Sequence, residues 1–479
     1  MLLSPWRIAS RKPCPSFRKS SLRQTRQLIT LAIETSCDDT AVAILEKQGN
    51  SATLHFNEKI TANNGAYKGI HPLVALESHQ ENLSALIRKA VQHLPHTSAR
   101  GNGRIPDFVS VTRGPGMRAN LCTGLDTAKG LAVAWEIPLL GVHHMQAHAL
   151  TPRLDYALCN TDPNSPLDPP FPFLSLLVSG GHTLLIHSES LTRHKILANT
   201  LDIAIGDCID KAARSILPAS LLVDAPSGAF GPLLEHFAFP NGSADYNYTP
   251  PSSRAEELAS CTRPSPYGWP FALPLAIGEG GKKSRTLAFA FSGMNTYVQR
   301  LAERGWDRDA NKLSKTRRDS PISQDEVRYL AQEVQRVAFE HLASRVVLVL
   351  QDMKEKGLQV PKTLVVSGGV AANAFLRLVM ESFLAVRGFE FVKTVTPPVR
   401  LCTDNAAMIA WAGMEMLEAG FMSKLDIRAL RRWSLENVEH PEREEDAKDI
   451  LTVLRDKERR QTEEMESMMQ GQDSAAVSK

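Results

Sequence analysis

The stretch LITLAIETSCDDTAVAIL, residues 28–45, decides the fold class of this chain. Apolar and β-branched residues flank a short polar turn, a pattern that predicts a β-hairpin. A second stretch of the same design, FLSLLVSGGHTLLI, occupies residues 173–186 and turns at a Gly-Gly pair. Two similar hairpins so far apart predict an α/β protein with a duplicated unit, and therefore two lobes with a cleft between them.

Two further segments combine a strand, a glycine-rich turn and a helix. Residues 363–383 run from an apolar strand through Gly-Gly into a helical pattern, and residues 107–135 do the same through Gly-Pro-Gly. Glycine lets backbone amides approach an anion closely, and a helix N-terminus favours negative charge. A single turn of this kind is ordinary, but several at strand ends predict a phosphate-binding cleft.

The segment IPLLGVHHMQAHAL, residues 137–150, predicts a strand followed by a helix that begins near His143. His144 and His148 then lie four residues apart on one helical face, where two imidazoles can share a metal ion. Asp404, just before the apolar helix that starts near residue 406, is the carboxylate that would complete a three-ligand site. Alternatively, Thr403 or Asp404 is only the N-cap of that helix.

Composition is that of an ordinary globular protein, with 43% hydrophobic residues. No apolar run reaches the roughly 18 residues of a membrane helix, so we expect no membrane partner. The seven cysteines form no CxxC pair. This spacing argues against a zinc ribbon and a disulfide framework, and it favours a reducing compartment.

The first 33 residues contain seven Lys and Arg, several serines and no acidic residue. That composition predicts a mitochondrial transit peptide and localisation in the matrix, the alternative being a basic tail. The whole chain carries a net charge of +3. The last 44 residues, 436–479, hold 13 acidic and 7 basic residues, which leaves 34–435 with only about +2. Nucleic acid would therefore bind through local basic patches and not through a global field.

We expect the following organisation. Residues 34–150 form an N-terminal lobe, 151–395 a C-terminal lobe, and 396–435 return to the N-terminal lobe. Residues 238–285, rich in Pro, Ser and Gly, form a surface insertion, and 436–479 form a charged tail.

The ordered set of motifs resembles the family of tRNA threonylcarbamoyladenosine transferases, within it the organellar, single-subunit branch. The motifs follow one another across most of residues 30–435. They are AIETSCDDTAVA (32–43), SHQENL (78–83), TRGPGMRANLCTG (112–124), GVHHMQAHAL (141–150), LLVSGGHT (176–183), GDCIDKAAR (206–214), FSGMNT (291–296), VVSGGVAANAFLR (365–377) and CTDNAAMIAWAG (402–413).

The resemblance implies an actin-like, sugar-kinase-like fold in two lobes. It also implies transfer of a threonylcarbamoyl group from threonylcarbamoyl-AMP to the exocyclic amine of adenosine 37 in tRNAs that read ANN codons. One divalent metal ion per subunit, iron or zinc, would be held by His144, His148 and Asp404. The implied partners are tRNA, an upstream threonylcarbamoyl-AMP synthase and a second copy of the chain. The implied catalytic residue is Asp210, and the donor-binding residues are Leu177, Val178, Ser179, Gly180, Gly181, Asp210, Gly231, Glu235 and Asn373.

The sequence departs from the family pattern at three places. Asp207 and Cys208 stand where Glu and Ala are usual, and Asn295 stands where Lys is common. The turn between residues 217 and 233 is stretched, so Gly228 is an alternative to Gly231 as a donor contact. Asp210, next to Lys211, has the alternative role of a surface ion pair.

Three other functions compete with this hypothesis. A nucleotide-hydrolysing or sugar-phosphorylating enzyme of the same fold could hold magnesium with the acidic residues of 34–39, but it would leave the two histidines without a purpose. A metalloprotease would need the HExxH glutamate, which is missing here. A non-catalytic binding subunit would not need complete metal and donor motifs.

Three basic clusters are candidates for contact with tRNA phosphates. They are Lys282, Lys283 and Arg285; then Lys312, Lys315, Arg317 and Arg318; then Arg431 and Arg432. The second is the densest, and we expect it beside the cleft.

Overall fold

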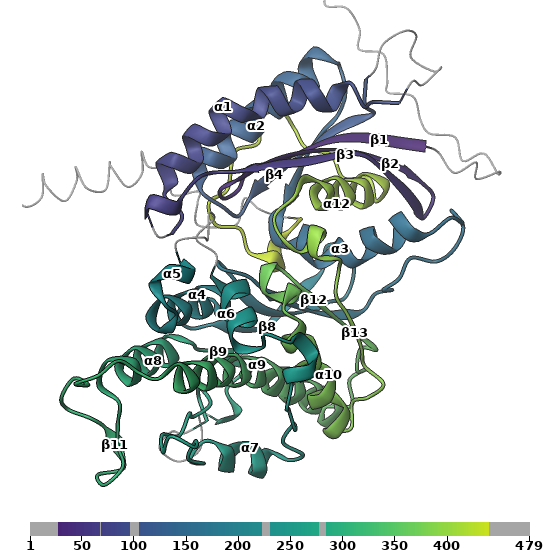
Figure 1. Cartoon of the computed structure of the whole chain (residues 1–479). Helices are drawn as coiled ribbons and strands as arrows, with labels where there is room; N and C mark the ends of the chain where they lie inside the picture. Colours follow the sequence, from purple (N-terminus) through teal and green to yellow (C-terminus); the bar gives the residue numbers. More distant parts are fainter. Residues whose placement is uncertain (1–26, 68, 96–104, 223–229, 277–283, 440–479) are drawn as a thin grey trace, which may run out of the picture.

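Two separate β-sheets form the two halves of the molecule (Figure 1), which is a computed structural model describing residues 27–67, 69–95, 105–222, 230–276 and 284–439. The first sheet has the order β3-β2-β1-β4-β5. Its strands are β1 (Gln27–Glu34), β2 (Asp39–Gln48), β3 (Ser51–Thr61), β4 (Phe108–Gly114) and β5 (Leu139–His143). The first expected hairpin is confirmed, because β1 and β2 pair antiparallel. Strands β1, β4 and β5 are parallel, so their carboxyl ends meet at one edge.

The second sheet has the order β13-β12-β6-β7-β8-β9. Its strands are β6 (Phe173–Val178), β7 (Thr183–Ser188), β8 (His194–Thr200), β9 (Ala288–Phe289), β12 (Thr363–Ser367) and β13 (Lys393–Val395). The second expected hairpin, β6 with β7, is confirmed, and β6 runs parallel to β12. The glycine turns after β6 and β12 therefore lie side by side at the same edge of this sheet. A small pair, β10 (Trp306–Asp307) and β11 (Lys312–Leu313), stands apart.

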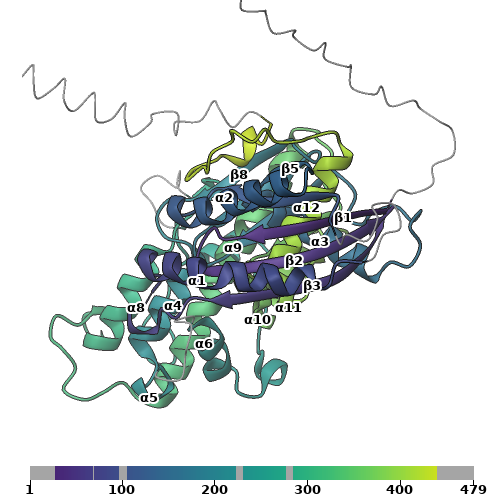
Figure 2. The same cartoon turned by 90° about the horizontal axis from the view of Figure 1, so that it is seen from above.

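Helices cover both faces of the first sheet because its strands alternate between two cores. Leu31, Ile33 and Ile44 pack toward α1 (Pro72–Val91) and α2 (Arg118–Ala134), which lie over this face of the sheet in Figure 2. Ala32 and Ala43 face α12 (Ala406–Glu418). Helix α3 (His144–Cys159) packs against α12 and also against β6 and β12 of the second sheet. One core thus joins the two halves through α3 and α12.

The far face of the second sheet carries most of the remaining helices. They are α4 (Ile205–Ile216), α6 (Gly231–Ala238), α8 (Ser292–Arg304), α9 (Gln324–Glu355) and α10 (Ala374–Val386), with the short α5 (Ala219–Leu222) and α7 (Arg254–Ser260). The short α11 (Val399–Cys402) lies instead against α3. The segment 238–285, expected as a surface insertion, also contributes to the core in its described part. Trp269 is fully buried, and Phe271 and Leu273 join the same core, because this segment closes over α9.

The start of the first strand limits where a transit peptide can end. β1 begins at Gln27, inside the range 1–33 expected for that peptide, and Ile29 to Ile33 are buried in the sheet. Cleavage that keeps this sheet intact must therefore fall before Gln27. Residues 1–26 and 440–479 lie outside the described part of the chain, as do Gly228, Lys282 and Lys283. Among the described helices, none has the length and apolar character needed to cross a membrane.

Candidate active site

The site begins at the junction between β5 and α3, where two adjacent histidines have different roles. His143 is the N-cap of α3: its Nδ1 accepts hydrogen bonds from the backbone N–H groups of Met145 (3.1 Å) and Gln146 (3.3 Å). The proton of the neutral ring is then on Nε2, which donates to the carbonyl of Trp433 at 3.0 Å. Burial lowers the pKa of His143 to about 3, so the ring stays neutral. His143 is therefore a structural residue, and the helix starts at His144 as expected.

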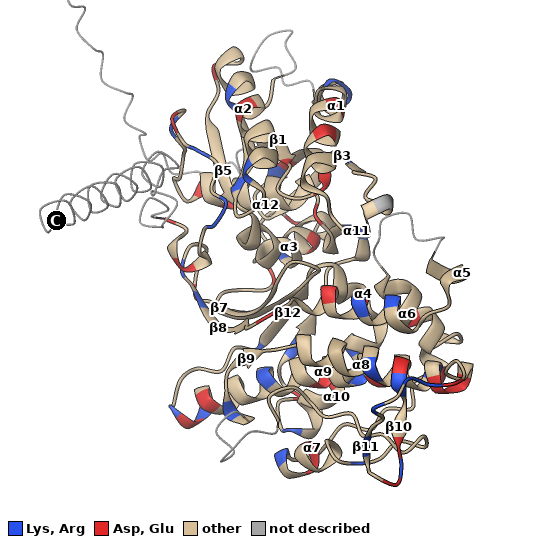
Figure 3. Cartoon of the chain, turned by 90° about the vertical axis from the view of Figure 1, so that its left-hand side faces the viewer, with Lys and Arg blue, Asp and Glu red and all other residues tan. Residues whose placement is uncertain are grey.

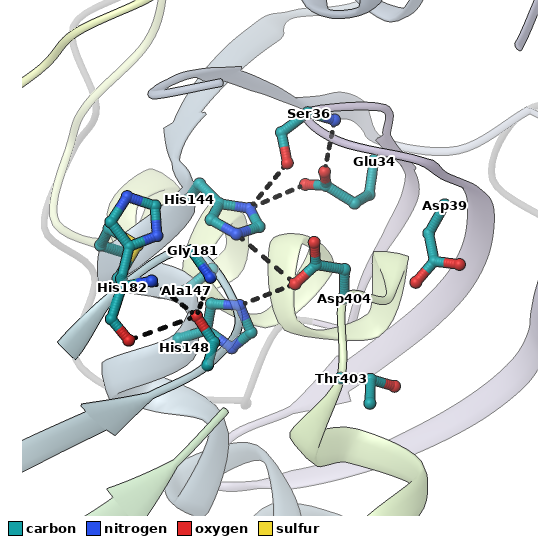
Figure 4. Close-up of polar contacts among 12 residues, drawn as sticks. Glu34, Ser36, Asp39, His144, Ala147, His148, Gly181, His182, Thr403 and Asp404 are labelled. Atoms are coloured by element: carbon teal, nitrogen blue, oxygen red, sulfur yellow. Dashed lines mark hydrogen bonds and ion pairs between the residues drawn. The ribbon is translucent and has the colours of Figure 1, made fainter. Parts of the chain in front are cut away.

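His144, His148 and Asp404 come together at the first turn of α3 (Figure 4). The two imidazole rings are 4.7 Å apart between centroids. Oδ1 of Asp404 lies 3.1 Å from Nε2 of His148 and 3.6 Å from Nε2 of His144. Helix α12 is capped by Asn405, whose side chain accepts from Met408 N. The alternative that Thr403 or Asp404 is the N-cap is therefore wrong.

The three side chains fit a divalent metal ion. Their ligand atoms lie within 4.8 Å of one another, and two imidazole nitrogens with one carboxylate oxygen suit iron or zinc. A metal-binding histidine usually has its other ring nitrogen held by a hydrogen bond. His144 has this arrangement, because its Nδ1 faces Glu34 and Ser36 while its Nε2 faces Asp404.

Glu34 is the supporting residue that the sequence did not reveal. It is fully buried at the end of β1, and Oε2 lies 3.3 Å from Nδ1 of His144. Its carboxylate also accepts from Ser36 N at 2.6 Å and from the hydroxyl of Thr112. The only signal was an acidic residue closing an apolar strand, which also fits the magnesium site of the kinase hypothesis.

His144 and the carboxylates beside it shift one another's pKa values. Burial alone would lower the pKa of His144, but the carboxylates of Asp404 and Glu34 raise it to about 9. Burial would raise the pKa of Asp404, but His144 and His148 hold it below its usual value. Lys59 of β3 fixes the loop from the other side: its Nζ donates to Asp39 (2.6 Å) and to the backbone carbonyl of Asp404 (3.3 Å). These contacts pre-position the acidic ligand.

Glycine turns from two neighbouring strands lie beside this centre. In the turn after β6, the hydroxyl of Ser179 accepts from the N–H groups of Gly181 (3.3 Å) and His182 (3.0 Å). Gly206, at the start of α4, packs so close that a Cβ there would lie 2.7 Å from the nitrogen of Gly180. Gly368 has φ +98°, and a Cβ there would lie 2.4 Å from the carbonyl of Val178. Both positions require glycine, and the turns expose backbone that a phosphate can approach.

The remaining predicted donor residues hold helix N-termini around the same region. Oδ1 of Asp210 accepts from Phe230 N (2.7 Å) and Gly231 N (2.8 Å). Glu235 accepts from Ala374 N at 2.9 Å. The alternative of an ion pair between Asp210 and Lys211 is wrong, because Lys211 pairs with Asp207 at 2.7 Å.

Asn373 combines two hydrogen bonds that the sequence did not reveal. It caps α10 through Leu376 N at 3.0 Å, and its amide donates to Gln335 at 2.9 Å. Asn373 is thereby fixed between α9 and α10, at the turn that follows β12.

Cys208 and Asn295, two residues at which the sequence departs from the family pattern, contact each other. Sγ of Cys208, on α4, lies 3.6 Å from Oδ1 of Asn295, on α8. Cys208 is buried, and burial raises the pKa of its thiol to about 12. The exchanges at these two positions therefore form one local packing change between α4 and α8.

The expectation that the densest basic cluster lies beside the site is wrong. Figure 1 places β11, which begins at Lys312, at the far end of the second half, away from α3 and α12. Arg318 pairs with Glu326 at 2.8 Å and lies against Gly305, so it is a structural residue.

Fold and site together define a two-lobed α/β enzyme of the actin-like class, with phosphate-suited turns next to three side chains that could hold a metal ion. Residues 55–411 match the family model described as "TsaD: tRNA N6-adenosine threonylcarbamoyltransferase". The chain belongs to this family of tRNA-modifying transferases, which confirms the fold class and the resemblance found in the sequence.

Two sequence relatives agree with the family match. The mitochondrial tRNA N6-adenosine threonylcarbamoyltransferase of Schizosaccharomyces pombe is 35% identical over 91% of this chain and 95% of that protein. The Bartonella henselae enzyme is 34% identical over 86% of this chain and 96% of its own length. Among solved structures, HypF of T. kodakarensis is 14% identical, with a TM-score of 0.40 over 84% of this chain and 49% of that one.

Proposed function

We propose that this chain transfers the threonylcarbamoyl group of threonylcarbamoyl-AMP to N6 of adenosine 37, in mitochondrial tRNAs that read ANN codons. The observation that carries this proposal is the juxtaposition of His144, His148 and Asp404 with the glycine turns at residues 179–181 and 368–369. A donor with a nucleotide phosphate and an acyl group needs both features within one site.

The reaction makes the bond between N6 and the carbamoyl carbon and breaks the bond between that carbon and the phosphate oxygen. AMP leaves, and the N6 proton passes to the released phosphate or to solvent. The donor is a mixed anhydride, so its carbonyl is already activated. The protein must mainly orient two large substrates, and positioning of this kind is worth about 7–11 kcal/mol.

The residues divide this work as follows. The backbone from Leu177 to Gly181 holds the donor phosphate, where Ser179 shapes the turn. Asp210, Gly231, Glu235 and Asn373 hold the nucleoside part. The second carboxylate oxygen of Asp210 accepts from a donor hydroxyl, while its first oxygen holds the start of α6.

His144, His148 and Asp404 hold one iron or zinc ion per subunit, which supplies Lewis-acid polarisation of an oxygen of the donor when it is bound. His144 presents Nε2 because Glu34 and Ser36 occupy Nδ1. We propose further that the enzyme works as a homodimer in the mitochondrial matrix and is supplied by a threonylcarbamoyl-AMP synthase. The named location of the Schizosaccharomyces pombe relative and the acid-free, basic start of the chain support the location.

The test is direct. The purified chain is incubated with threonylcarbamoyl-AMP and unmodified mitochondrial tRNA, and the nucleosides are analysed by mass. We expect N6-threonylcarbamoyladenosine at position 37 and an equal amount of AMP. Conversion of donor to AMP without modified adenosine, or no reaction at all, would contradict the proposal.

A further inference from the structure

A strap of chain after α12 connects the two sheets along one side of the molecule. Ser423 N donates to the carbonyl of Leu139 on β5, and Ile196 N on β8 donates to Glu436. Figure 2 shows this segment, the yellow end of the described chain, passing along β5 and β8. We call residues 424–432 (KLDIRALRR) the basic strap, because four of its nine residues are Lys or Arg and one is acidic.

The basic strap is held by backbone hydrogen bonds and by the apolar side chains of Ile427 and Ala429, so the charges of Lys424, Arg428 and Arg431 are not needed to hold it. Leu430 N donates to the carbonyl of Arg113 at 2.8 Å, and Gly116 N donates to the carbonyl of Arg431 at 3.2 Å. Gly114 allows this approach, since a Cβ there would lie 2.1 Å from the carbonyl of Leu430. Lys424, Arg428 and Arg431 meanwhile have exposed side chains.

The same side of the molecule is hollowed and positively charged. A pocket of about 460 Å³ is lined by Lys424 and Arg428 of the strap, by Arg113 and Arg118, and by the acidic Asp426 and Glu439. Figure 3 shows Lys and Arg gathering here, beside β5. Arg118 begins α2, where the helix dipole is positive, so its charge does not serve to stabilise that helix. Excess positive charge of this kind suits a phosphate backbone.

The basic strap is also close to the transfer site. Gly116, which bonds to Arg431, packs on Ser36, where a Cβ would lie 2.6 Å from the Ser36 carbonyl. Ser36 in turn contacts Nδ1 of His144 at 3.2 Å. A second contact brings the strap's end close to the site: the rings of Trp433 and His143 are 4.6 Å apart between centroids. RNA phosphates bound to the strap would therefore lie next to the base that reacts.

Resting on the proposed function, we infer that the basic strap, with Arg118, binds the tRNA phosphates that flank the reacting adenosine. The side chains act through charge and not through base recognition, because Lys and Arg on an exposed strap reach backbone phosphates without reading sequence. The surface is the edge of the first sheet, and not the Lys312–Arg318 cluster that the sequence favoured.

The test compares two triple variants of the full-length chain. Lys424→Gln, Arg428→Gln and Arg431→Gln remove three charges from the strap. Lys312→Gln, Lys315→Gln and Arg317→Gln remove three exposed charges from the β11 region and serve as the matched control. Affinity for unmodified tRNA is measured over a series of NaCl concentrations. Each lost phosphate contact should reduce the slope of log K against log salt by about 0.7–0.9.

We expect the strap variant to bind tRNA at least about tenfold more weakly at moderate salt, with a slope smaller by about 2. The control should bind like the parent, and metal content and thermal unfolding should not change in either variant. The double variant Arg428→Lys with Arg431→Lys keeps both charges and should bind tRNA like the parent. Unchanged affinity and slope in the strap variant, equal losses in the control, or a parent that binds no tRNA would each overturn the inference.

The parent's transfer reaction separates this inference from the proposed function. A parent that binds tRNA through the strap but modifies no adenosine contradicts the proposed function alone. A parent that modifies adenosine 37 while the strap variant binds normally contradicts the strap alone.

Discussion

Oε2 of Glu34 lies 3.3 Å from Nδ1 of His144, and the glutamate that makes this contact is completely buried. The pair connects the last residue of β1 with the first residue of α3, so the sheet itself orients one of the three candidate metal ligands.

We expect Glu34→Gln to weaken metal binding by about 10–100-fold, the usual effect of losing a supporting carboxylate. Competition with a chelator measures the affinity of the purified variant. Glu46→Gln is the matched control, because Glu46 also contacts a histidine, His55, at 2.7 Å, and neither residue belongs to the candidate metal site. Equal metal affinity in Glu34→Gln and parent would show that this carboxylate does not support the metal.

Substitutions of the adjacent histidines His143 and His144 should affect different properties, the first the stability of the fold and the second metal binding. His143→Ala removes the N-cap of α3 and should lower the free energy of unfolding by about 1–2 kcal/mol. His144→Ala, His148→Ala and Asp404→Ala should each lose bound metal and transfer activity while the fold persists. Denaturant unfolding and elemental analysis measure the two properties. Metal retained by all three ligand variants would place the metal elsewhere.

Arg153 and Glu415 form a buried, bidentate ion pair between α3 and α12, with both N–O distances at 2.9 Å. Removing one partner leaves an uncompensated charge in the core, so Arg153→Ala should cost about 3–5 kcal/mol. Lys356→Ala, which breaks an exposed pair with Asp352, should cost less than about 1 kcal/mol. Urea unfolding gives both values, and similar losses in the two variants would contradict this assignment.

His194 should make stability depend on pH. Burial lowers its pKa to about 4, whereas the ordinary value is 6.5. Between these values the unfolded chain holds the extra proton, so stability falls as pH falls from 6.5 toward 4. In His194→Asn the free energy of unfolding should depend less steeply on pH, by about 1 kcal/mol per unit near pH 5.5. Parallel curves for variant and parent would refute a neutral, buried His194.

The first 26 residues should direct the chain into mitochondria. A fusion of residues 1–35 to a fluorescent protein should enter mitochondria, and the mature N-terminus of the full chain should lie at or before Gln27, since β1 starts there. Microscopy and N-terminal sequencing check the two statements. Cytosolic fluorescence would remove the localisation, and cleavage beyond Ile29 would contradict the strand.

Local pattern in the sequence determined the two hairpins and two of the three candidate metal ligands. Alternating apolar residues around short turns predicted the β1–β2 and β6–β7 hairpins, and four-residue spacing placed His144 and His148 on one helical face. Both features depend on backbone periodicity, which neighbouring residues alone decide. Asp404 was a candidate from its place in the sequence, but the local pattern fitted a helix cap equally well, and only the resemblance implied that it is a ligand.

Only the tertiary structure decided how distant segments meet. The contact of Glu34 with His144, the burial of Trp269 over α9 and the pairing of Arg318 with Glu326 all join residues that no local pattern connects. The basic strap is the clearest case. A run of charges in the sequence does not show which surface it lies on. The strap is placed near the site because it contacts Gly114 and Gly116, and Gly116 packs on Ser36, which contacts His144.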